Sequence, residues 1–252
     1  MSTQRVVIIT GTSKGLGAAL AQQVLDADTT LFSIARGTNP SLAATAAERG
    51  AIVHSLQADL SSAEGTRQAQ EWLQHALPRT AQQYWLINNA GTVEPIAQAN
   101  QLNDAQAIQH ALQLNVGSAI ALCATLLAAT DANPHAERRI LNISSGAGRR
   151  SVAGWGVYGA TKAALDFYTQ TMAMENHPRL RCVSLAPGVI DSPMQSVIRQ
   201  QHADDFPDVQ RFLNLHAEQQ LSSPDETAAN ILRHMGSDAF GSTLLDDIRR
   251  YL

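Results

Sequence analysis

Cysteine is scarce in this sequence of 252 residues, which has only Cys123 and Cys182. Two cysteines make neither a disulfide framework nor a cysteine metal set, and we expect both to be buried as small apolar side chains. The eight histidines are scattered, with no His/Cys/Glu cluster at the spacing of zinc ligands. The sequence therefore predicts no metal site.

Charge and long apolar runs are also limited. Charged residues make up 16% of the chain and the net charge is -4, which gives no electrostatic basis for binding nucleic acid or an anionic membrane. No apolar run approaches the roughly 20 residues that span a bilayer. The first expected strand begins within a few residues of Met1 and leaves no room for a signal peptide. We therefore expect a cytoplasmic protein.

What the sequence does contain is a regular alternation of short β-branched runs and longer helical patterns, within a 44% apolar composition that suits one sizeable core. This pattern predicts an α/β fold, a single domain over residues 1–252 with a doubly wound parallel sheet and helices on both faces. The expected strands are Arg5–Thr10, Thr30–Ala35, Ile52–Ala58, Tyr84–Asn88, Arg139–Ser144 and Arg181–Ala186, with a short last one near Ser242–Leu245. The expected helices are Leu16–Ala27, Ser41–Arg49, Ala63–Ala76, Asp104–Ala129 and Val157–Asn176.

The segment Asp191–Leu221 interrupts this alternation. It is polar, with Met194, Phe206 and Phe212 as isolated apolar anchors. Long excursions at the ligand-binding edge of such a sheet are often lids, so we expect a substrate lid over 191–221. A surface insertion without function is the alternative.

A glycine-rich turn, TGTSKGLG, follows the first expected strand and leads into a helix. Its glycines are Gly11, Gly15 and Gly17. They let the backbone turn tightly and approach a pyrophosphate, and the N–H groups of the following helix then point at the phosphates. We expect Ser13 and Leu16 to contact the cofactor in the same turn.

The end of the second strand indicates which nucleotide is bound. An NAD site places a carboxylate there on the ribose hydroxyls, whereas this strand ends in Arg36. Arg36 suits a ribose 2′-phosphate, and Lys14 in the glycine turn supplies a second positive charge. The sequence therefore favours NADP(H) over NAD.

Two further strand ends provide contacts to the adenosine half. Asp59 closes the third strand and is placed to accept a hydrogen bond from the adenine amino group, with Leu60 beside it. The turn Asn88-Asn89-Ala90-Gly91 ends the fourth strand with small residues that allow close approach. We expect Asn89, Ala90 and Gly91 to line the cofactor.

Tyr158 and Lys162 lie four residues apart, so on a helix they share one face, and Ser145 precedes the tyrosine by thirteen residues. Use of a tyrosine as a base near pH 7 needs a pKa shift of about 3 units, or roughly 4 kcal/mol. One cation about 4 Å away supplies energy on the order of 4 kcal/mol at an effective dielectric of 20. Lys162 and an oxidised nicotinamide together can therefore activate Tyr158, which donates its proton to a carbonyl oxygen in the reductive direction. Ser145 is placed to hold that oxygen.

Two other segments complete the expected site. Asn115 is a polar residue in an apolar helix, either a satisfied buried amide or a helix kink that holds a water linking Lys162 to solvent. The run from Pro187 to Ser192 follows a strand with a rigid turn. We expect Pro187, Gly188, Val189 and Ile190 to give contacts to the nicotinamide amide, together with the hydroxyl of Ser192.

With these motifs in this order and spacing, the chain resembles the short-chain dehydrogenase/reductase family in its shorter form, over nearly its whole length. The resemblance implies a Rossmann-like fold, a nicotinamide cofactor, a Ser145–Tyr158–Lys162 site assisted by Asn115, and a homodimer or homotetramer formed through the two long helices. A narrower likeness, to sepiapterin reductases and bacterial benzil (diketone) reductases, rests on GWGVYGATKAA and APGVIDSPMQ. It implies a substrate contact from Asp247 as a C-terminal aspartate. We also expect Ser145 and the apolar set of Trp155, Met194, Phe206 and Phe212 to surround the substrate. Trp155 as a core residue is the alternative for that position.

The resulting hypothesis is an NADPH-dependent carbonyl reductase for a small ketone or α-diketone, with Tyr158 as general acid. An NAD(P)-dependent dehydrogenase of a sugar, steroid or other alcohol is the alternative, because the same residues serve both directions. A non-catalytic NADP sensor needs the glycine turn but not Ser145, Tyr158 and Lys162 together.

Overall fold

The computed structural model describes residues 5–251. Its centre is a seven-stranded parallel sheet in the order β3-β2-β1-β4-β5-β6-β7. The strands are β1 Arg5–Thr10, β2 Thr29–Ala35, β3 Ile52–Gln57, β4 Gln83–Asn88, β5 Glu137–Ile143, β6 Leu180–Ala186 and β7 Leu245–Asp247. Each of the first six matches its predicted range to within about two residues, and β7 lies three residues further along the chain than expected. The predicted doubly wound parallel sheet is confirmed.

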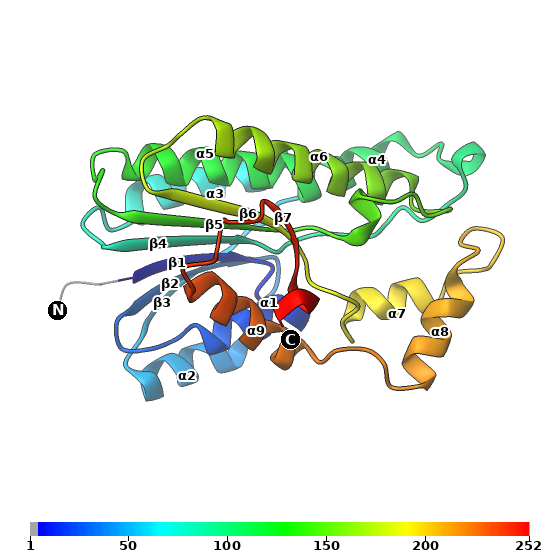
Figure 1. Cartoon of the computed structure of the whole chain (residues 1–252), viewed down its shortest axis with the longest axis horizontal. Helices are drawn as coiled ribbons and strands as arrows, with labels where there is room; N and C mark the ends of the chain where they lie inside the picture. Colours follow the sequence, from blue (N-terminus) through cyan, green and yellow to red (C-terminus); the bar gives the residue numbers. More distant parts are fainter. Residues whose placement is uncertain (1–4, 252) are drawn as a thin grey trace.

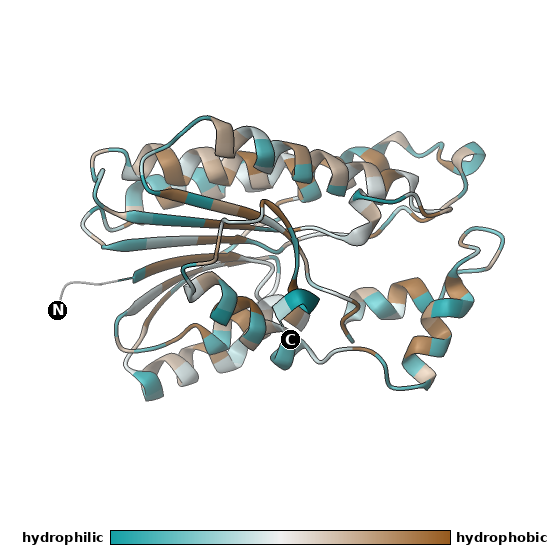
Figure 2. Ribbon diagram, viewed as in Figure 1, coloured by the Kyte–Doolittle hydropathy of each residue, from teal (hydrophilic) through white to brown (hydrophobic). Residues whose placement is uncertain are grey.

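Helices cover both faces of the sheet (Figure 1). On one face lie α3 Ala63–Ala76, α4 Ala105–Leu112, α5 Ser118–Thr130 and α6 Gly156–Met174. The other face carries α1 Gly15–Gln23, α2 Pro40–Arg49 and α9 Pro224–Gly236, the last of which the sequence analysis did not predict. Each layer buries its own apolar cluster against the sheet, and the central strands are apolar on both faces (Figure 2).

The strand β3 lies at one edge of the sheet and is largely exposed, with Ile52 at 52% exposure. The reversal of strand order lies between β1 and β4, where the chain leaves β1 toward β2 on one side and reaches β4 on the other. Ligands of open α/β sheets bind beyond the carboxyl ends of the strands at such a reversal.

The stretch Ala105–Thr130 is one continuous helical rod whose middle, Gln113–Gly117, forms a π-helical turn. It is long and apolar enough to cross a membrane by length and composition, which corrects the expectation that no segment qualifies. In the fold it lies in the helical layer, where α5 packs on α3 and the π turn packs on α6. Burial against neighbouring helices accounts for part of its apolar character, since 44% of its most apolar window is buried.

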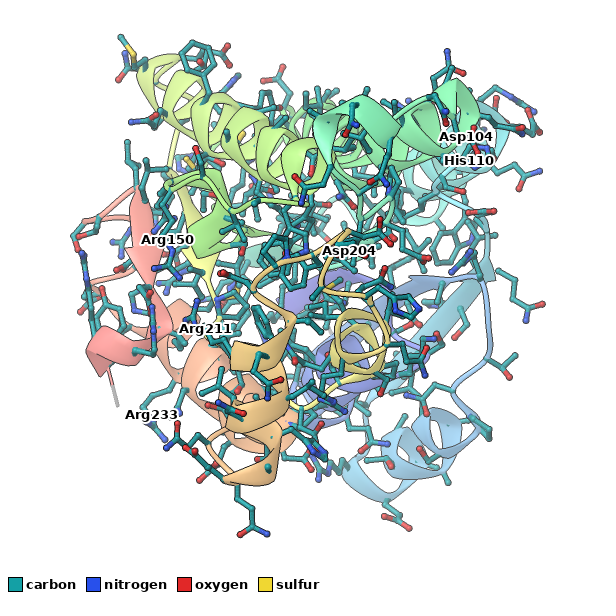
Figure 3. All side chains as sticks on the ribbon, turned by 90° about the vertical axis from the view of Figure 1, so that its right-hand side faces the viewer. Asp104, His110, Arg150, Asp204, Arg211 and Arg233 are labelled. Carbon is teal, nitrogen blue, oxygen red and sulfur yellow. The ribbon has the colours of Figure 1, made fainter. Side chains whose placement is uncertain are left out.

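The segment expected to be a lid contains two helices, α7 Pro193–Arg199 and α8 Val209–Ala217. They pack on each other and stand beside the carboxyl edge of the sheet, apart from the two helical layers (Figure 1). Figure 3 faces this edge, with Arg211 of α8 and Asp204 of the preceding loop in front of the sheet and His110 of α4 on the opposite rim. The segment is thus placed as a lid would be, and closure stays a prediction.

Candidate active site

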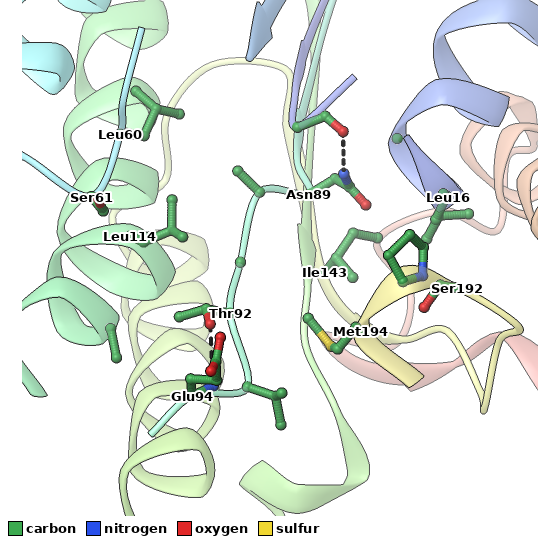
Figure 4. A pocket seen from close by; sticks show the side chains of 18 of the residues that line it. Leu16, Leu60, Ser61, Asn89, Thr92, Glu94, Leu114, Ile143, Ser192 and Met194 are labelled. Atoms are coloured by element: carbon green, nitrogen blue, oxygen red, sulfur yellow. Dashed lines mark hydrogen bonds between the residues drawn. The ribbon is translucent and has the colours of Figure 1, made fainter. Parts of the chain in front are cut away.

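A cavity of about 620 Å³ opens at the carboxyl ends of the central strands. Most of the residues predicted from separate sequence motifs line it together. Figure 4 shows Leu60, Ser61 and Leu114 at one end, the Asn89 turn in the middle, and Ser192 and Met194 beyond it. The predicted residues in the lining are Gly11, Ser13, Lys14, Gly15, Leu16, Gly17, Arg36, Asp59, Leu60, Asn89, Ala90, Gly91, Ser145, Tyr158, Lys162, Pro187, Gly188, Ile190, Ser192 and Met194.

The glycine turn and the Asn89 turn form one hydrogen-bonded unit. The Thr10 hydroxyl accepts from the backbone N–H groups of Asn89 and Ala90 at 3.0 and 2.9 Å. The Asn89 amide donates back to the Thr10 carbonyl at 2.9 Å. A Cβ on Gly17 would lie 2.1 Å from the Gly11 carbonyl oxygen, so α1 approaches the turn as closely as only glycine allows.

Positive charge gathers at the β2 end of the cavity. Arg36 directly follows β2 and Lys14 is the residue before α1, and both are exposed and line the cavity. Asp59 lies nearby. Burial raises its pKa, but hydrogen bonds from the Ser61 hydroxyl and N–H, at 2.7 and 3.0 Å, outweigh burial and hold the pKa below its usual value. Asp59 is therefore an ionised acceptor in the lining.

Tyr158 and Lys162 lie on the first two turns of α6, both almost fully buried. The Lys162 ammonium is 5.7 Å from the centre of the Tyr158 ring and donates to the Ile143 carbonyl at 2.8 Å. Ser145 follows β5 and hydrogen-bonds Tyr158. The strand end and the helix thus bring the three predicted side chains together at the cavity wall.

Burial shifts both ionisable groups of this cluster. It raises the pKa of Tyr158, an effect that the hydrogen bond with Ser145 opposes. It lowers the pKa of Lys162 to about 8, against the opposing charge of Asp166. The surrounding side chains thus favour the protonated phenol, and the lowered pKa that the sequence argument assigned to Tyr158 is not produced by them.

Asn115 sits in the π-helical turn and is 2% exposed. Its amide donates to the Thr92 carbonyl at 2.9 Å and to the Thr161 hydroxyl at 3.0 Å, and its oxygen accepts from the Thr92 N–H at 2.8 Å. The side chain is therefore a satisfied buried amide that ties the Asn89 turn to α6. It does not line the cavity, and the water link stays a prediction.

Five residues expected to contact or surround ligand lie outside the lining, and four of them, Val189, Trp155, Phe206 and Phe212, share one cluster. Trp155 stacks on Phe206 with ring centres 4.9 Å apart and meets the Tyr158 ring edge-on at 5.3 Å. Phe212 of α8 joins the same buried cluster, and Val189 packs against it. This aromatic cluster thus packs against the Tyr158 ring, and Trp155 lies in it as the core residue that was the alternative prediction for this position.

Asp247 is also absent from the lining. Its carboxylate forms an ion pair with Arg249 at 2.5 Å, and Arg249 holds the pKa of Asp247 below its usual value. A Cβ on Gly188 would lie 3.8 Å from the Arg249 side chain, so the pair adjoins the turn after β6.

The cavity has walls that the sequence analysis did not predict. Val93, Glu94 and Pro95 directly follow the Asn89 turn, and that position after a strand end was the available signal. Other unpredicted residues come from helices whose cavity-facing side no motif marks: Ala107, His110, Ala111 and Leu114 from the helical rod, and Val197 from α7.

A doubly wound sheet with a glycine turn at its reversal and a buried Tyr–Lys–Ser cluster beside it defines a class of oxidoreductases acting on C=O and CH–OH groups. The chain belongs to the short chain dehydrogenase family, whose model matches residues 5–203. It is 36% identical over 242 residues to a benzil reductase ((S)-benzoin forming) of Bacillus cereus, covering 94% of this chain and 96% of that protein. It is 32% identical to the sepiapterin reductase of Meriones unguiculatus over 248 residues, 94% of this chain and 93% of that one.

The fold has a matching counterpart among solved structures. A short-chain dehydrogenase/reductase from Burkholderia vietnamiensis is 33% identical, with a TM-score of 0.69 and full coverage of both chains.

Proposed function

We propose that this protein is an NADPH-dependent carbonyl reductase for small neutral ketones and α-diketones, with Tyr158 as general acid. The observation that carries the proposal is the Ser145–Tyr158–Lys162 cluster, which opens into the same cavity as Lys14 and Arg36. Similarity to a benzil reductase and a sepiapterin reductase supports carbonyl reduction.

The residues present fit a dinucleotide. Gly15, Leu16 and Gly17, the first residues of α1, line the cavity, as a phosphate site at a helix N-terminus requires. The cavity of about 620 Å³ continues from Asp59 at one end to Tyr158 at the other. The glycine turn would hold the pyrophosphate, Asp59 the adenine, and Pro187, Gly188, Ile190 and Ser192 the nicotinamide end. When bound, the reduced cofactor supplies the hydride that converts a carbonyl to an alcohol.

The side chains supply the proton. Tyr158 donates its phenolic proton to the carbonyl oxygen, and the hydroxyl of Ser145 orients that oxygen by a hydrogen bond. Negative charge then develops on the phenolic oxygen, and the ammonium of Lys162 stabilises it. The raised pKa of Tyr158 supports this direction, because it keeps the phenol protonated near neutral pH. Asn115 holds α6 against the Asn89 turn through Thr161 and Thr92.

The substrate class follows from the remaining lining and the relatives. Val93, Pro95, Met194 and Val197 offer apolar surface near Tyr158. The direct test is loss of NADPH absorbance with benzil, phenyl-propanedione, isatin, sepiapterin and simple ketones. Turnover of the dicarbonyls supports the proposal. Tight NADPH binding with no turnover of any carbonyl contradicts it and favours an alcohol substrate or a sensor.

Arg36→Ala is expected to lower the preference for NADPH over NADH by roughly 10- to 100-fold. Charge-assisted hydrogen bonds contribute about 1.5–3 kcal/mol each, and Arg36 is proposed to bind the 2′-phosphate that only NADPH carries. Affinities for both cofactors are measured by fluorescence titration. Arg49→Ala, on the exposed end of α2, is the control. An unchanged NADPH to NADH ratio in Arg36→Ala contradicts the assignment.

We also propose that α5 and α6 mediate self-association. Phe167 and Met174 on α6 are 72% and 79% exposed, and Ile120 on α5 is 36% exposed. No charged residue occurs in α5, and the two in α6, Lys162 and Asp166, are buried. This uncharged apolar face suits contact with a second copy.

Phe167→Asp is expected to raise the dissociation constant of that assembly by more than about 100-fold, because it removes a large apolar contact and buries a charge. Light scattering after size exclusion measures the mass. Leu213→Asp, on α8, is the control for an equally drastic substitution at an exposed leucine. A Phe167→Asp protein with the mass of the parent protein contradicts the interface, as does a monomeric parent protein.

A further inference from the structure

Behind the Tyr158–Lys162 cluster lies an ion pair that the proposed chemistry does not use. Arg149 follows the short turn Gly146–Gly148 that begins at Ser145. Its guanidinium donates to the Asp166 carboxylate at 3.0 Å, to the Asp246 carbonyl at 2.8 Å and to the Ser184 carbonyl at 3.0 Å. One side chain therefore links the Ser145 turn to α6, β6 and β7.

Asp166 is held on both oxygens. One accepts from Arg149 and the other from the Ser184 hydroxyl at 2.5 Å, and the residue is only 4% exposed. A carboxylate this buried keeps its charge at a large cost unless it is paired and hydrogen-bonded, and here it is both. Asp166 lies four residues after Lys162 on α6, so the carboxylate and the ammonium share one face of the helix.

The turn that carries Ser145 is also packed directly on the lysine. A Cβ on Gly148 would lie 2.8 Å from the Lys162 carbonyl carbon and 3.0 Å from the Lys162 Cβ. The ion pair between Arg149 and Asp166 thus fixes the Ser145 turn against the stretch of α6 from which Lys162 projects.

We propose that Asp166, held by Arg149 and Ser184, is a positioning residue that keeps Lys162 protonated in the resting enzyme. This inference rests on the proposed function for its meaning, because the charge on Lys162 is what stabilises the developing phenolate of Tyr158. The protonation state of Lys162 can be measured without substrate.

Burial lowers the pKa of Lys162 to about 8, close to physiological pH, and Asp166 is the negative charge that opposes it. The other groups around the pair are the phenol of Tyr158, the carbonyl of Ile143, the hydroxyl of Ser184 and the guanidinium of Arg149. Arg149 also interacts with the carboxylate of Asp247. Arg149 compensates Asp166 only in part, since the arginine side chain is 28% exposed and screened by water.

The protonation of Lys162 can be followed directly by NMR because the chain contains only two lysines, Lys14 and Lys162. A protein labelled with ¹³C at the lysine ε-carbon gives two side-chain signals. Lys14 is exposed and serves as an internal reference. The signal that disappears in Lys162→Met belongs to Lys162, and the signal that remains belongs to Lys14.

Asp166→Asn is expected to move the titration of the Lys162 signal down by about one pH unit or more. The variant loses the attraction between the carboxylate and the ammonium, and even a modest attraction between buried charges shifts a pKa by about one unit. At the pH of the midpoint measured for the parent protein, a shift of one unit lowers the protonated fraction from about a half to about a tenth, so kcat falls about five-fold while KM changes little. The alkaline limb of the pH profile of kcat moves down by the same amount. Ser184→Ala is the matched control, because it removes a hydrogen bond to the same carboxylate and leaves the charge.

The outcomes separate this inference from the proposed function. A Lys162 titration at the same pH in the parent protein, Asp166→Asn and Ser184→Ala overturns the inference, whatever the substrate panel shows. A shifted titration in an enzyme that reduces no carbonyl supports the inference and contradicts the proposed function.

A second variant covers the case in which Asp166→Asn does not fold. Arg149→Met removes the positive charge that compensates Asp166, while the Ser184 hydroxyl still donates to the carboxylate. The full charge of Asp166 then acts on Lys162, so the Lys162 titration is expected to move up by a fraction of a unit. Arg150→Met is its control, because Arg150 is the exposed neighbour labelled in Figure 3. A titration that stays in place in Arg149→Met overturns the inference.

Discussion

Replacing Tyr158 with phenylalanine is expected to lower kcat for carbonyl reduction by about 10²–10⁴-fold, the range typical of losing a positioned general acid. The phenylalanine ring keeps the edge-on contact with Trp155 at 5.3 Å, so the aromatic cluster is preserved. The variant lacks the proton that the substrate oxygen must receive. NADPH affinity is expected to change by less than about two-fold, because the loss concerns a group at the reacting end of the cavity.

The measurement combines turnover, followed by NADPH absorbance, with NADPH binding, followed by fluorescence. Tyr168→Phe is the matched control, since it removes a hydroxyl from the same helix more than two turns away. Turnover in Tyr158→Phe equal to that of the parent protein would remove Tyr158 from the mechanism. Equal losses in both variants would indicate a general effect on α6 rather than loss of the acid.

The strands were the most predictable part of the fold. Strands β1, β2 and β4 to β6 are short apolar runs covered by helices on both faces, so local sequence and burial agree. The end of β7 was misplaced because three residues that pair only with β6 leave almost no periodic signal. The helix α9 was missed for a different reason. Its apolar positions pack on α1 from a distant part of the chain, and the weak signal of β7 did not mark the helix before it.

The same distinction applies to the site. Residues that meet because two adjacent strand ends meet, such as Ser145 and the Asn89 turn, were predictable from spacing. Trp155 and Phe206 depend on how the loop before α6 packs on the loop before α8, a contact between segments about 50 residues apart in the sequence. Asp247 was assigned from a short C-terminal match, whereas its carboxylate is engaged by Arg249. Loop packing and local ion pairs are not encoded in the periodicity of a single element.

The second large effect is expected at the glycine turn. Gly17→Ala places a methyl group 2.1 Å from the Gly11 carbonyl oxygen and 2.4 Å from the Asn89 side-chain nitrogen, distances far inside van der Waals contact. The carbonyl belongs to the backbone and cannot rotate away, so the turn between β1 and α1 has to move. That movement also disturbs the hydrogen bonds that join Thr10 to Asn89 and Ala90.

Overpacking of this kind costs about 1–3 kcal/mol, so NADPH affinity is expected to fall roughly 10- to 100-fold and the melting temperature by several degrees. Gly37→Ala, next to Arg36 and outside the lining of the cavity, is the control. Its added methyl would lie 3.5 Å from the Ser13 Cβ, an ordinary contact, and both quantities are expected to stay unchanged. If Gly17→Ala binds NADPH as tightly as Gly37→Ala does, the pyrophosphate does not rest on this turn. The dinucleotide orientation proposed here would then be wrong, because every contact from Lys14 to Tyr158 is placed relative to it.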